Sequence, residues 1–190
     1  MDKKDLLKEK IEHLSLDTFN PVPLVDAMEK MAFQARNTAR AAKIYERMLN
    51  DSECSIILCL AGSLVSAGLK KVLLQMVENH MVDAIVSTGG TGLTGRDVTV
   101  EAHRDVYEKE IDAFGTVFTM ISMEKIGTSA VQSRATGGVA QGTYLFALPG
   151  SPGACKDAWD GILLKQLDYR HMPCNFVEIM PRLDEHQRRK

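Results

Sequence analysis

The first half of the chain contains two short apolar runs with an amphipathic stretch between them. The runs cover residues 55–60 and 84–86, which is the length of buried strands. Between them, residues 64–79 follow a helical period. Strand, helix and strand in this order predict a βαβ unit, with two parallel neighbouring strands joined by a right-handed crossover.

A second group of strands is predicted in the second half of the chain. Residues 135–140 and 143–148 are apolar and flank Gln141-Gly142, a sequence typical of a hairpin turn. A further apolar run over residues 175–180 predicts an edge strand. Together these patterns predict an α/β fold, a Rossmann-like three-layer α/β/α sandwich. Its sheet is mostly parallel, with one antiparallel hairpin.

Helices are predicted wherever apolar residues recur every three or four positions. Residues 24–49 keep this period throughout and predict one long helix. Three more helices are predicted at residues 99–111, 115–123 and 154–167. Thr99 is the predicted N-cap of the first of these three. A Lys/Glu-rich stretch over residues 1–16 predicts a short amino-terminal helix, which two prolines end.

Composition narrows the class of protein. With 190 residues, 45% of them hydrophobic, the chain fits one globular domain, with a helical extension over residues 1–20 and a tail over 184–190. The net charge of −2 disfavours a broad nucleic-acid surface. No apolar run has the length of a membrane span, and the start of the chain is too charged for a secretory signal. We therefore expect a cytoplasmic protein that binds neither nucleic acid nor membranes.

The richest candidate chemistry lies between the predicted strand at 84–86 and the helix that follows it. A glycine-rich loop between a strand and a helix lets backbone N–H groups converge on an anion. The loop residues are Thr88, Gly89, Gly90, Thr91 and Gly92. Asp97, at the end of the loop, is a candidate ligand for Mg²⁺ beside a phosphate. The alternative is a glycine-rich turn that serves only tight packing.

A second candidate segment follows the strand predicted at 55–60. Gly62 and Ser63 stand at its carboxyl end. Parallel strands end at a common edge, and ligands of open α/β sheets bind there. We therefore expect these two residues to lie on the same edge of the sheet as the glycine-rich loop.

An ordered set of motifs runs through the second half of the chain. They are Thr88-Gly-Gly-Thr-Gly92, Arg96-Asp-Val-Thr99, Phe114-Gly115, Gly127-Thr-Ser129, Ser133-Arg-Ala135, Leu148-Pro-Gly-Ser151 and Leu167-Asp-Tyr-Arg170. Over residues 85–183 the chain thereby resembles the molybdopterin adenylyltransferase family and its relatives in molybdenum cofactor biosynthesis, protein B among them.

This resemblance implies a site for a phosphate-bearing pterin. The residues that it assigns to binding are the loop at 89–92, Ser133, Arg134, Pro149, Gly150 and Ser151. It also implies that Asp97 supports Mg²⁺ and adenylyl transfer from ATP. For Arg134 two roles stay open, because an arginine here can pair with the phosphate or form a structural salt bridge.

The first half of the chain resembles a different family. Phe33-Gln-Ala-Arg-Asn37, Leu64-Val-Ser-Ala-Gly68 and the strand leading to Gly89 are similar to the amino-terminal part of deoxyhypusine synthase, over residues 19–89. The resemblance implies that the turn at Gly62 and Ser63 and the turn at Gly89 approach NAD. The catalytic lysine of that family belongs to a part with no counterpart here, so deoxyhypusine synthesis is not expected.

The two resemblances meet at residues 86–90. We therefore hypothesise an engineered chimera that joins residues 21–88 of one origin to 89–183 of another, with a sheet one strand narrower than in the second family. A Ser-Asp turn and a second acidic loop of the molybdopterin adenylyltransferase family are replaced here by sequence that resembles deoxyhypusine synthase. We therefore expect a partial binding site without assured activity. The alternatives are an active adenylyltransferase-like enzyme, an NAD-binding module, and a folded domain without a physiological ligand. A homo-oligomer, trimer or dimer, is also expected, with a monomer as the alternative.

Overall fold

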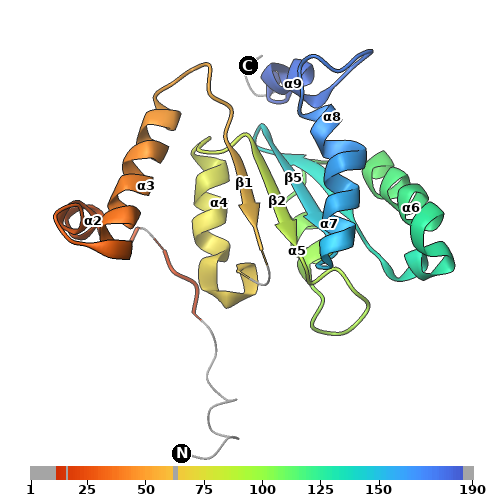
Figure 1. Ribbon diagram of the computed structural model, residues 1–190, viewed down its shortest axis with the longest axis horizontal. Coiled ribbons are helices and arrows are strands. Elements are labelled where there is room, and N and C mark those ends of the chain that lie inside the picture. Colours follow the sequence, from red (N-terminus) through yellow and green to blue (C-terminus); the bar gives the residue numbers. More distant parts are fainter. Residues whose placement is uncertain (1–11, 16, 62–63, 186–190) are drawn as a thin grey trace, which may run out of the picture.

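The computed structural model describes residues 12–15, 17–61 and 64–185. Over these residues, helices flank both faces of a five-stranded mixed sheet (Figure 1), which confirms the predicted α/β fold. Most of the helix predicted over residues 1–16 lies outside the described residues, and the predicted tail is described only as far as Glu185. None of the helices in the described part of the chain has both the length and the apolar character that crossing a membrane requires.

The sheet combines a parallel part with an antiparallel edge, in the order β1-β2-β5-β4-β3. β1 (Ile57–Leu60), β2 (Ala84–Thr88) and β5 (Thr143–Leu148) are parallel neighbours. β4 (Thr136–Ala140) pairs with β5 as the predicted hairpin, and β3 (Lys109–Glu110) adds a short antiparallel strand to it. The βαβ unit and the hairpin thus form as the apolar pattern predicted.

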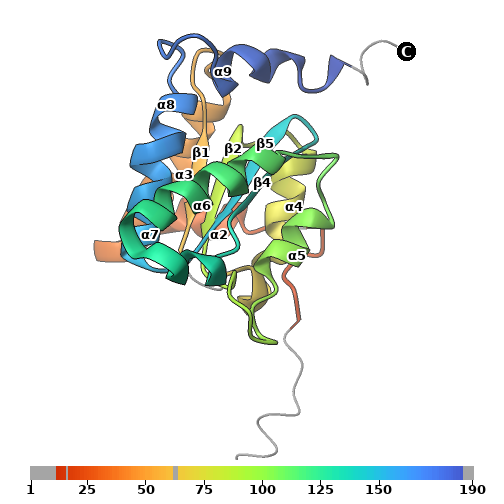
Figure 2. The ribbon, with the colours of Figure 1, turned by 90° about the vertical axis from the view of Figure 1, so that its right-hand side faces the viewer.

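Helices and helical turns connect these strands. The α-helices are α2 (Val22–Met28), α3 (Phe33–Leu49), α4 (Lys70–Glu78), α5 (Thr99–Arg104), α6 (Asp112–Ile126), α7 (Pro152–Ala158), α8 (Leu164–Gln166) and α9 (Phe176–Ile179). The other helical turns are η1 (Val65–Leu69), η2 (Gly127–Gln132), η3 (Trp159–Leu163) and η4 (Met180–Arg182). Figure 2 shows α4 and α5 on one side of the sheet and α6 and α7 on the other.

The single long helix predicted over residues 24–49 is wrong, because the structure has two helices there. α2 ends at Met28, and α3 begins at Phe33, whose φ is +53°. A φ of this sign does not occur inside a right-handed helix, so the backbone must start a new helix at this point. The apolar period continues across the break, since it reports side-chain spacing and not backbone dihedral angles.

The helix predicted over residues 99–111 is also wrong beyond Arg104. After α5 the chain turns and enters β3, where Glu108 N–H donates to the Val139 carbonyl at 2.8 Å. The Tyr107 ring packs directly over Gly138, which has no side chain to exclude it. Thr99 is the first helical residue and not the N-cap; Val98 occupies that position without a side-chain cap. Pairing with β4 therefore overrides the helical period.

The edge strand predicted over residues 175–180 is helical instead, as α9 and η4. Asn175 is 1% exposed, and its side-chain oxygen accepts a hydrogen bond from Glu178 N–H at 2.9 Å. Its amide group donates to the carbonyls of Tyr169 and His171. A buried asparagine cap thus decides the conformation of an apolar run that is too short to be assigned by periodicity.

The core divides into two clusters, one on each face of the sheet. Alternate residues of β2 face opposite sides, so Val86 belongs to one cluster and Ile85 to the other. The cluster under α6 and α7 contains Phe114, Phe118, Tyr144, Phe146 and Leu163, and the cluster under α4 contains Ile56, Leu60, Val77, Val82 and Leu145. The sheet therefore has two separately packed faces.

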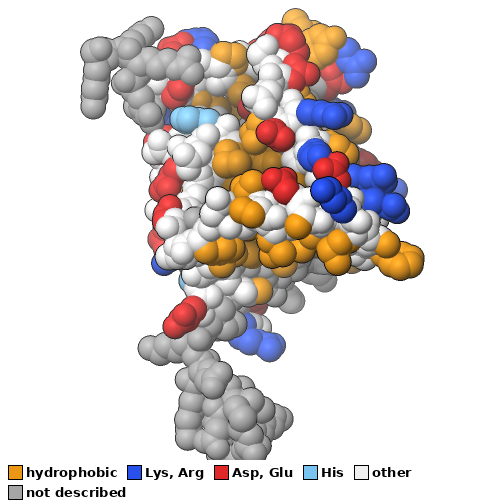
Figure 3. Space-filling view, turned by 90° about the vertical axis from the view of Figure 1, so that its left-hand side faces the viewer, with side chains coloured by type: hydrophobic (Ala, Val, Ile, Leu, Met, Phe, Trp, Pro, Cys, Tyr) orange, Lys and Arg blue, Asp and Glu red, His pale blue; other side chains and the backbone are white. Residues whose placement is uncertain are grey.

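Hydrophobic side chains are exposed on the side of the molecule where α2 and α3 lie (Figure 3). Phe33 is 84% exposed, and Leu24 and Ile44 are exposed by more than half. On the same half of the molecule, β1 is an edge strand in which Ile57 remains 38% exposed. Apolar side chains thus remain exposed around α2, α3 and β1.

Candidate functional site

The carboxyl ends of β2 and β5 bring two of the predicted segments together. Thr88 and Leu148 are register partners, so the loops that follow these strands leave the sheet side by side. Gly89 N–H donates to the Leu148 carbonyl at 2.9 Å. A Cβ atom placed on Gly150 would lie 3.1 Å from the Gly89 Cα, so the two loops touch backbone to backbone.

Gly90 fixes the shape of the loop after β2. Its φ is +66°, in the left-handed region, and a Cβ atom there would lie 2.3 Å from the Thr99 hydroxyl oxygen. Thr99 N–H donates to the Gly90 carbonyl at 2.9 Å, which folds the loop back onto the start of α5. Both the dihedral angle and the space therefore require glycine at this position.

Arg134 holds this loop from inside the protein. Its Nε donates to the carbonyls of Thr91 (3.1 Å) and Gly92 (3.0 Å), and one Nη donates to the Asp97 carbonyl at 3.0 Å. The guanidinium also forms an ion pair with Glu101 in α5, and hydrogen bonds from Arg134 hold the pKa of that carboxyl below its usual value. Arg134 thus forms a salt bridge with Glu101, and its pairing with a phosphate stays a prediction.

Asp97 closes the far end of the same loop. Its Oδ2 accepts hydrogen bonds from Thr94 N–H (3.0 Å) and from the Thr94 hydroxyl (2.7 Å). Hydrogen bonds from the side chain and backbone of Thr94, then the Gly92 backbone and the Arg134 charge, hold the pKa of Asp97 below its usual value. Asp97 is therefore ionised at neutral pH, with one carboxylate oxygen already engaged.

The residues around Asp97 do not form a magnesium site by themselves. Mg²⁺ takes six oxygen ligands, and proteins supply few of them when phosphates supply the others. In the described part of the chain, no group of three or more His, Cys, Asp or Glu side chains gathers where a metal ion could be held. Asp97 is a single ligand, and the nearby carboxylate of Glu101 is paired with Arg134.

Ser133 and Ser151 have local structural partners. The Ser151 hydroxyl caps α7 by accepting a hydrogen bond from Ala154 N–H at 3.2 Å. Ser133 follows η2, and its N–H donates to the Ala130 carbonyl at 3.0 Å. Pro149 accepts a hydrogen bond from the Cys155 thiol at 3.3 Å. The turn after β5 is thus tied firmly to the helix that it precedes.

A hollow of about 390 Å³ lies beside these loops, over the carboxyl ends of β1, β2 and β5. Thr88, Leu148 and Trp159 line it, together with Lys156 from α7. Ala61 lines it from β1, and the predicted Gly62 and Ser63, which come next, lie outside the described residues. The glycine-rich loop and the hollow therefore share one edge of the sheet.

The sequence analysis missed Lys156. The side chain is exposed at the wall of the hollow, and no ion pair involves it among the residues that the structure describes. The sequence feature that could have identified it is its position, in the second turn of the helix that follows the Leu148-Pro-Gly-Ser151 motif. Asp160, four residues further along, also lines the hollow, so this wall carries a lysine and a carboxylate that form no ion pair with each other in the described part of the chain.

One comparison with known proteins matches the first part of the chain and continues beyond it. A sequence model of the deoxyhypusine synthase family matches residues 23–138. The deoxyhypusine synthase-like protein of Chlorobaculum parvum (strain DSM 263 / NCIMB 8327) is 58% identical over 89 residues, which cover 47% of this chain and 25% of that protein. The chain therefore spans only a quarter of the length of this relative.

Other matches belong to molybdenum cofactor biosynthesis. Molybdenum cofactor biosynthesis protein B of Escherichia coli (strain K12) is 52% identical over 100 residues, which are 53% of this chain and 59% of that protein. A crystal structure of a molybdenum cofactor biosynthesis protein B superposes with a TM-score of 0.52 and 32% identity, and covers 70% of this chain and 95% of that one. Both resemblances predicted from the motifs are confirmed.

Proposed function

We propose that the loops after β2 and β5 bind a phosphate-bearing pterin of the molybdopterin class. The chain belongs to the deoxyhypusine synthase family over residues 23–138 and is related to molybdenum cofactor biosynthesis protein B. The observation that carries the proposal is the backbone contact between these loops at Gly89 and Gly150. It gathers the predicted binding segments at the edge of the sheet where ligands of α/β proteins bind.

The chemistry of the loops and of the hollow suits the two parts of such a ligand. The glycine-rich loop presents backbone to a phosphate, and the Lys156 ammonium adds a positive charge nearby. The side chains of Leu148 and Trp159 provide apolar and aromatic surface for a planar ring. Arg134 and Asp97 act on the ligand by holding the loop in shape.

The proposal is binding without adenylyl transfer. An enzyme that transfers a phosphoryl-type group must position the reactants and neutralise the charge of the phosphates. A site that keeps only part of the residues that do this loses much of the reaction rate. Here Arg134 and Glu101 are engaged with each other, and no group of three or more His, Cys, Asp or Glu side chains among the described residues could hold a metal ion. Mg²⁺ would neutralise phosphate charge if a nucleotide brought it in.

Calorimetric titration with a stable pterin phosphate, with and without Mg²⁺, tests binding. We expect micromolar affinity, lost in Gly90→Ala because the added Cβ clashes with Thr99. Lys156→Ala should weaken binding about ten-fold, the size of one charged hydrogen bond. Lys165→Ala, an exposed lysine of α8 away from the hollow, is the matched control. Absence of heat from a protein that melts cooperatively would contradict the proposal.

A turnover assay with molybdopterin, ATP and Mg²⁺ separates binding from catalysis. We expect no adenylylated product above the rate without protein. Product formation that disappears in Asp97→Ala would replace the binding proposal with an adenylyltransferase.

We further propose that the chain is an engineered chimera joined near residues 86–90. Support comes from high identity to two different proteins, 52% over 100 residues and 58% over 89 residues. A natural homologue that aligns over the full length would contradict this origin. A homo-oligomer, trimer or dimer, stays a prediction that light scattering can test.

A further inference from the structure

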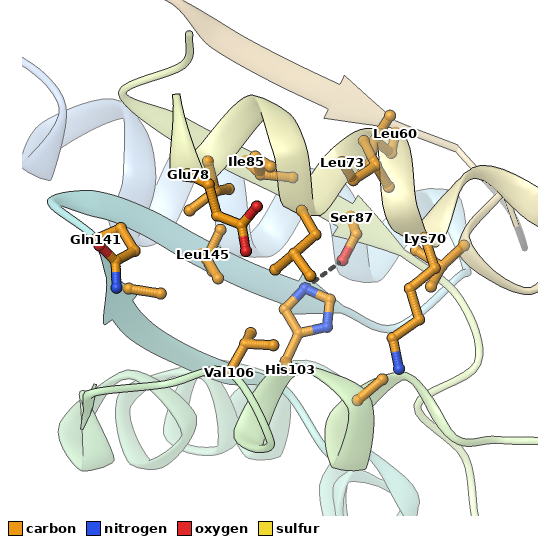
Figure 4. Close-up of a pocket in the computed structure, with 15 residues that line it drawn as sticks. Leu60, Lys70, Leu73, Glu78, Ile85, Ser87, His103, Val106, Gln141 and Leu145 are labelled. Atoms are coloured by element: carbon orange, nitrogen blue, oxygen red, sulfur yellow. Dashed lines mark hydrogen bonds between the residues drawn. The ribbon is translucent and has the colours of Figure 1, made fainter. Parts of the chain in front are cut away.

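A second pocket lies on the opposite face of the sheet from α7, between α4 and α5 (Figure 4). It has a volume of about 190 Å³. Leu73 and Val77 of α4 form one wall, and Val106 after α5 contributes to the other. Ile85 and Leu145 of the sheet form an apolar floor.

The two walls lie on opposite sides of residues 86–90 in the sequence, α4 before them and α5 after them, and the deoxyhypusine synthase model matches both. The pocket is separate from the hollow beside the loops proposed to bind the pterin.

One polar pair, Ser87 and His103, interrupts the apolar lining. His103 Nε2 lies 3.0 Å from the Ser87 hydroxyl oxygen, and its Nδ1 lies 2.9 Å from the Thr99 carbonyl (Figure 4 draws the first of these contacts). A carbonyl only accepts, so Nδ1 carries the proton and neutral His103 presents Nε2 as an acceptor. The Ser87 hydroxyl also lies 3.2 Å from the Phe146 carbonyl, to which it can donate.

This arrangement leaves the Ser87 oxygen without a donor. Burial lowers the pKa of His103, which favours the neutral ring at pH 7. The Ser87 hydroxyl then has two acceptors as neighbours, the His103 Nε2 atom and the Phe146 carbonyl. It has one proton, which it can donate to either of them. Among the described residues, no N–H or O–H group donates to Ser87 when His103 is neutral. The lone pairs of that oxygen can accept a hydrogen bond from a ligand.

Charge at the rim favours a neutral ligand. Lys70 and Glu78 lie on the exposed side of α4, two turns apart, and both line the pocket with Leu74 between them. Opposite charges at the two ends of the rim give no preference for either sign of ligand charge. The exposed Leu74 leaves the entrance apolar.

We propose that this pocket binds a neutral single-ring molecule that carries one hydroxyl group, of which phenol is the simplest. An apolar protein cavity of about 150 Å³ holds benzene, so the present volume accommodates one ring with a substituent. The ring packs between α4 and the sheet, and its hydroxyl donates to the Ser87 oxygen. The apolar walls supply the affinity and the buried Ser87 oxygen supplies the selectivity.

Titration with phenol and with toluene, which has a similar shape but no hydroxyl, tests the proposal. We expect phenol to bind about five-fold more tightly than toluene, the size of one net hydrogen bond. Because Ser87→Ala alone frees His103 Nε2 as an acceptor, the double change Ser87→Ala with His103→Leu removes both acceptors and should abolish the preference for phenol. Ser122→Ala, a buried serine of α6 under the other face, should leave the preference intact. Equal affinities in the unchanged protein, or a preference that survives the double change, would overturn the proposal.

A second variant locates the binding site independently of Ser87. Ala102 lines the pocket from α5, and Ala102→Leu fills part of its volume. We expect this variant to reduce the affinity for phenol more than ten-fold, and phenol to shift the ring proton resonances of His103 in the unchanged protein. Unaltered affinity in Ala102→Leu, or unshifted His103 resonances at saturation, would place phenol elsewhere and contradict the proposal.

Discussion

The aromatic core under α6 and the apolar layer under α4 differ in how closely they are packed. In the aromatic core, rings pack in tilted and stacked pairs, with the centroids of Phe114 and Phe146 4.9 Å apart. Phe118 and Phe146 have no exposed surface there. Under α4 and α5, the pocket of about 190 Å³ remains beside Leu145. The aromatic core is therefore closed, and the hollow of about 390 Å³ on the same side lies at the carboxyl ends of the strands, beside Leu148 and Trp159.

The packing beneath the covering helices accounts for this difference. Large aromatic side chains from α6, β5 and α9 pack against one another in the closed core. The side chains beneath α4 and α5, among them Leu73, Val77 and Leu145, leave the pocket between them. Protein interiors reach crystal-like density only where the shapes of the side chains are complementary, and beneath α4 and α5 that complementarity is incomplete.

Truncation of one large side chain on each face gives the largest contrast. Phe118→Ala should lower the free energy of unfolding by about 3–5 kcal/mol, because it opens a cavity in a closed core. Leu74→Ala, at the half-exposed rim of the pocket, should cost about 0.5 kcal/mol. Urea denaturation followed by circular dichroism measures both. Equal losses would mean that the faces are equally well packed.

Removal of Arg134 tests whether polar contacts hold α5 over the open face. Arg134→Ala leaves the carbonyls of Thr91, Gly92 and Asp97 without this donor, and should cost about 1–3 kcal/mol. Arg104→Ala breaks only an exposed pair with Glu110 and should cost less than about 1 kcal/mol. If urea denaturation gave the same loss for both, packing on the sheet would be what holds α5.

The stability of the open face should depend on pH through His103. Burial lowers its pKa in the folded state, so the unfolded chain binds more protons and stability falls as pH drops below about 6.5. Tyr107 packs against the ring, and Lys70 and Glu78 are the charged groups at the pocket rim. We expect the melting temperature to fall by a few degrees between pH 7.5 and 5.5.

His103→Gln is the control for that pH dependence, and its melting temperature should change less over the same range. The carboxylates whose pKa values are lowered by hydrogen bonds, such as Asp97 and Glu101, lose their contribution only at lower pH. A pH dependence identical to that of the unchanged protein would assign the effect to other groups.

Addition of volume should change stability with opposite signs on the two faces. Ala102→Leu fills part of the pocket and should raise the free energy of unfolding by about 0.5–1 kcal/mol. Ala158→Leu places the same atoms in the closed core, where Ala158 is 0% exposed, and should cost about 1–3 kcal/mol. Destabilisation by both changes would show that the pocket has no room for a larger side chain.

The sequence predicted the sheet better than the helices. β2 and β5 contain continuous apolar runs and are followed by glycine or proline. The apolar pattern therefore predicted both that they are strands and where they end. The break at Phe33 depends on a backbone angle, and β3 depends on pairing with β4, neither of which an apolar period records. The helix at Asn175 depends on hydrogen bonds from a single side chain.

The candidate site was predictable where topology alone decides it. Parallel strands place the loops after Thr88 and Leu148 side by side whatever the side chains are. The role of Arg134 depends on which acceptors surround it in three dimensions, and Lys156 is useful only because the hollow opens beside it. These two assignments required coordinates.

An NMR titration with a stable pterin phosphate tests the central claim most directly. Amide resonances of residues 89–92 and 150–151 and of Lys156 should shift together with one micromolar dissociation constant, while the His103 ring resonances across the sheet stay in place. Shifts confined to other parts of the molecule, or no shifts in the folded protein, would contradict the assignment of these loops as the ligand site.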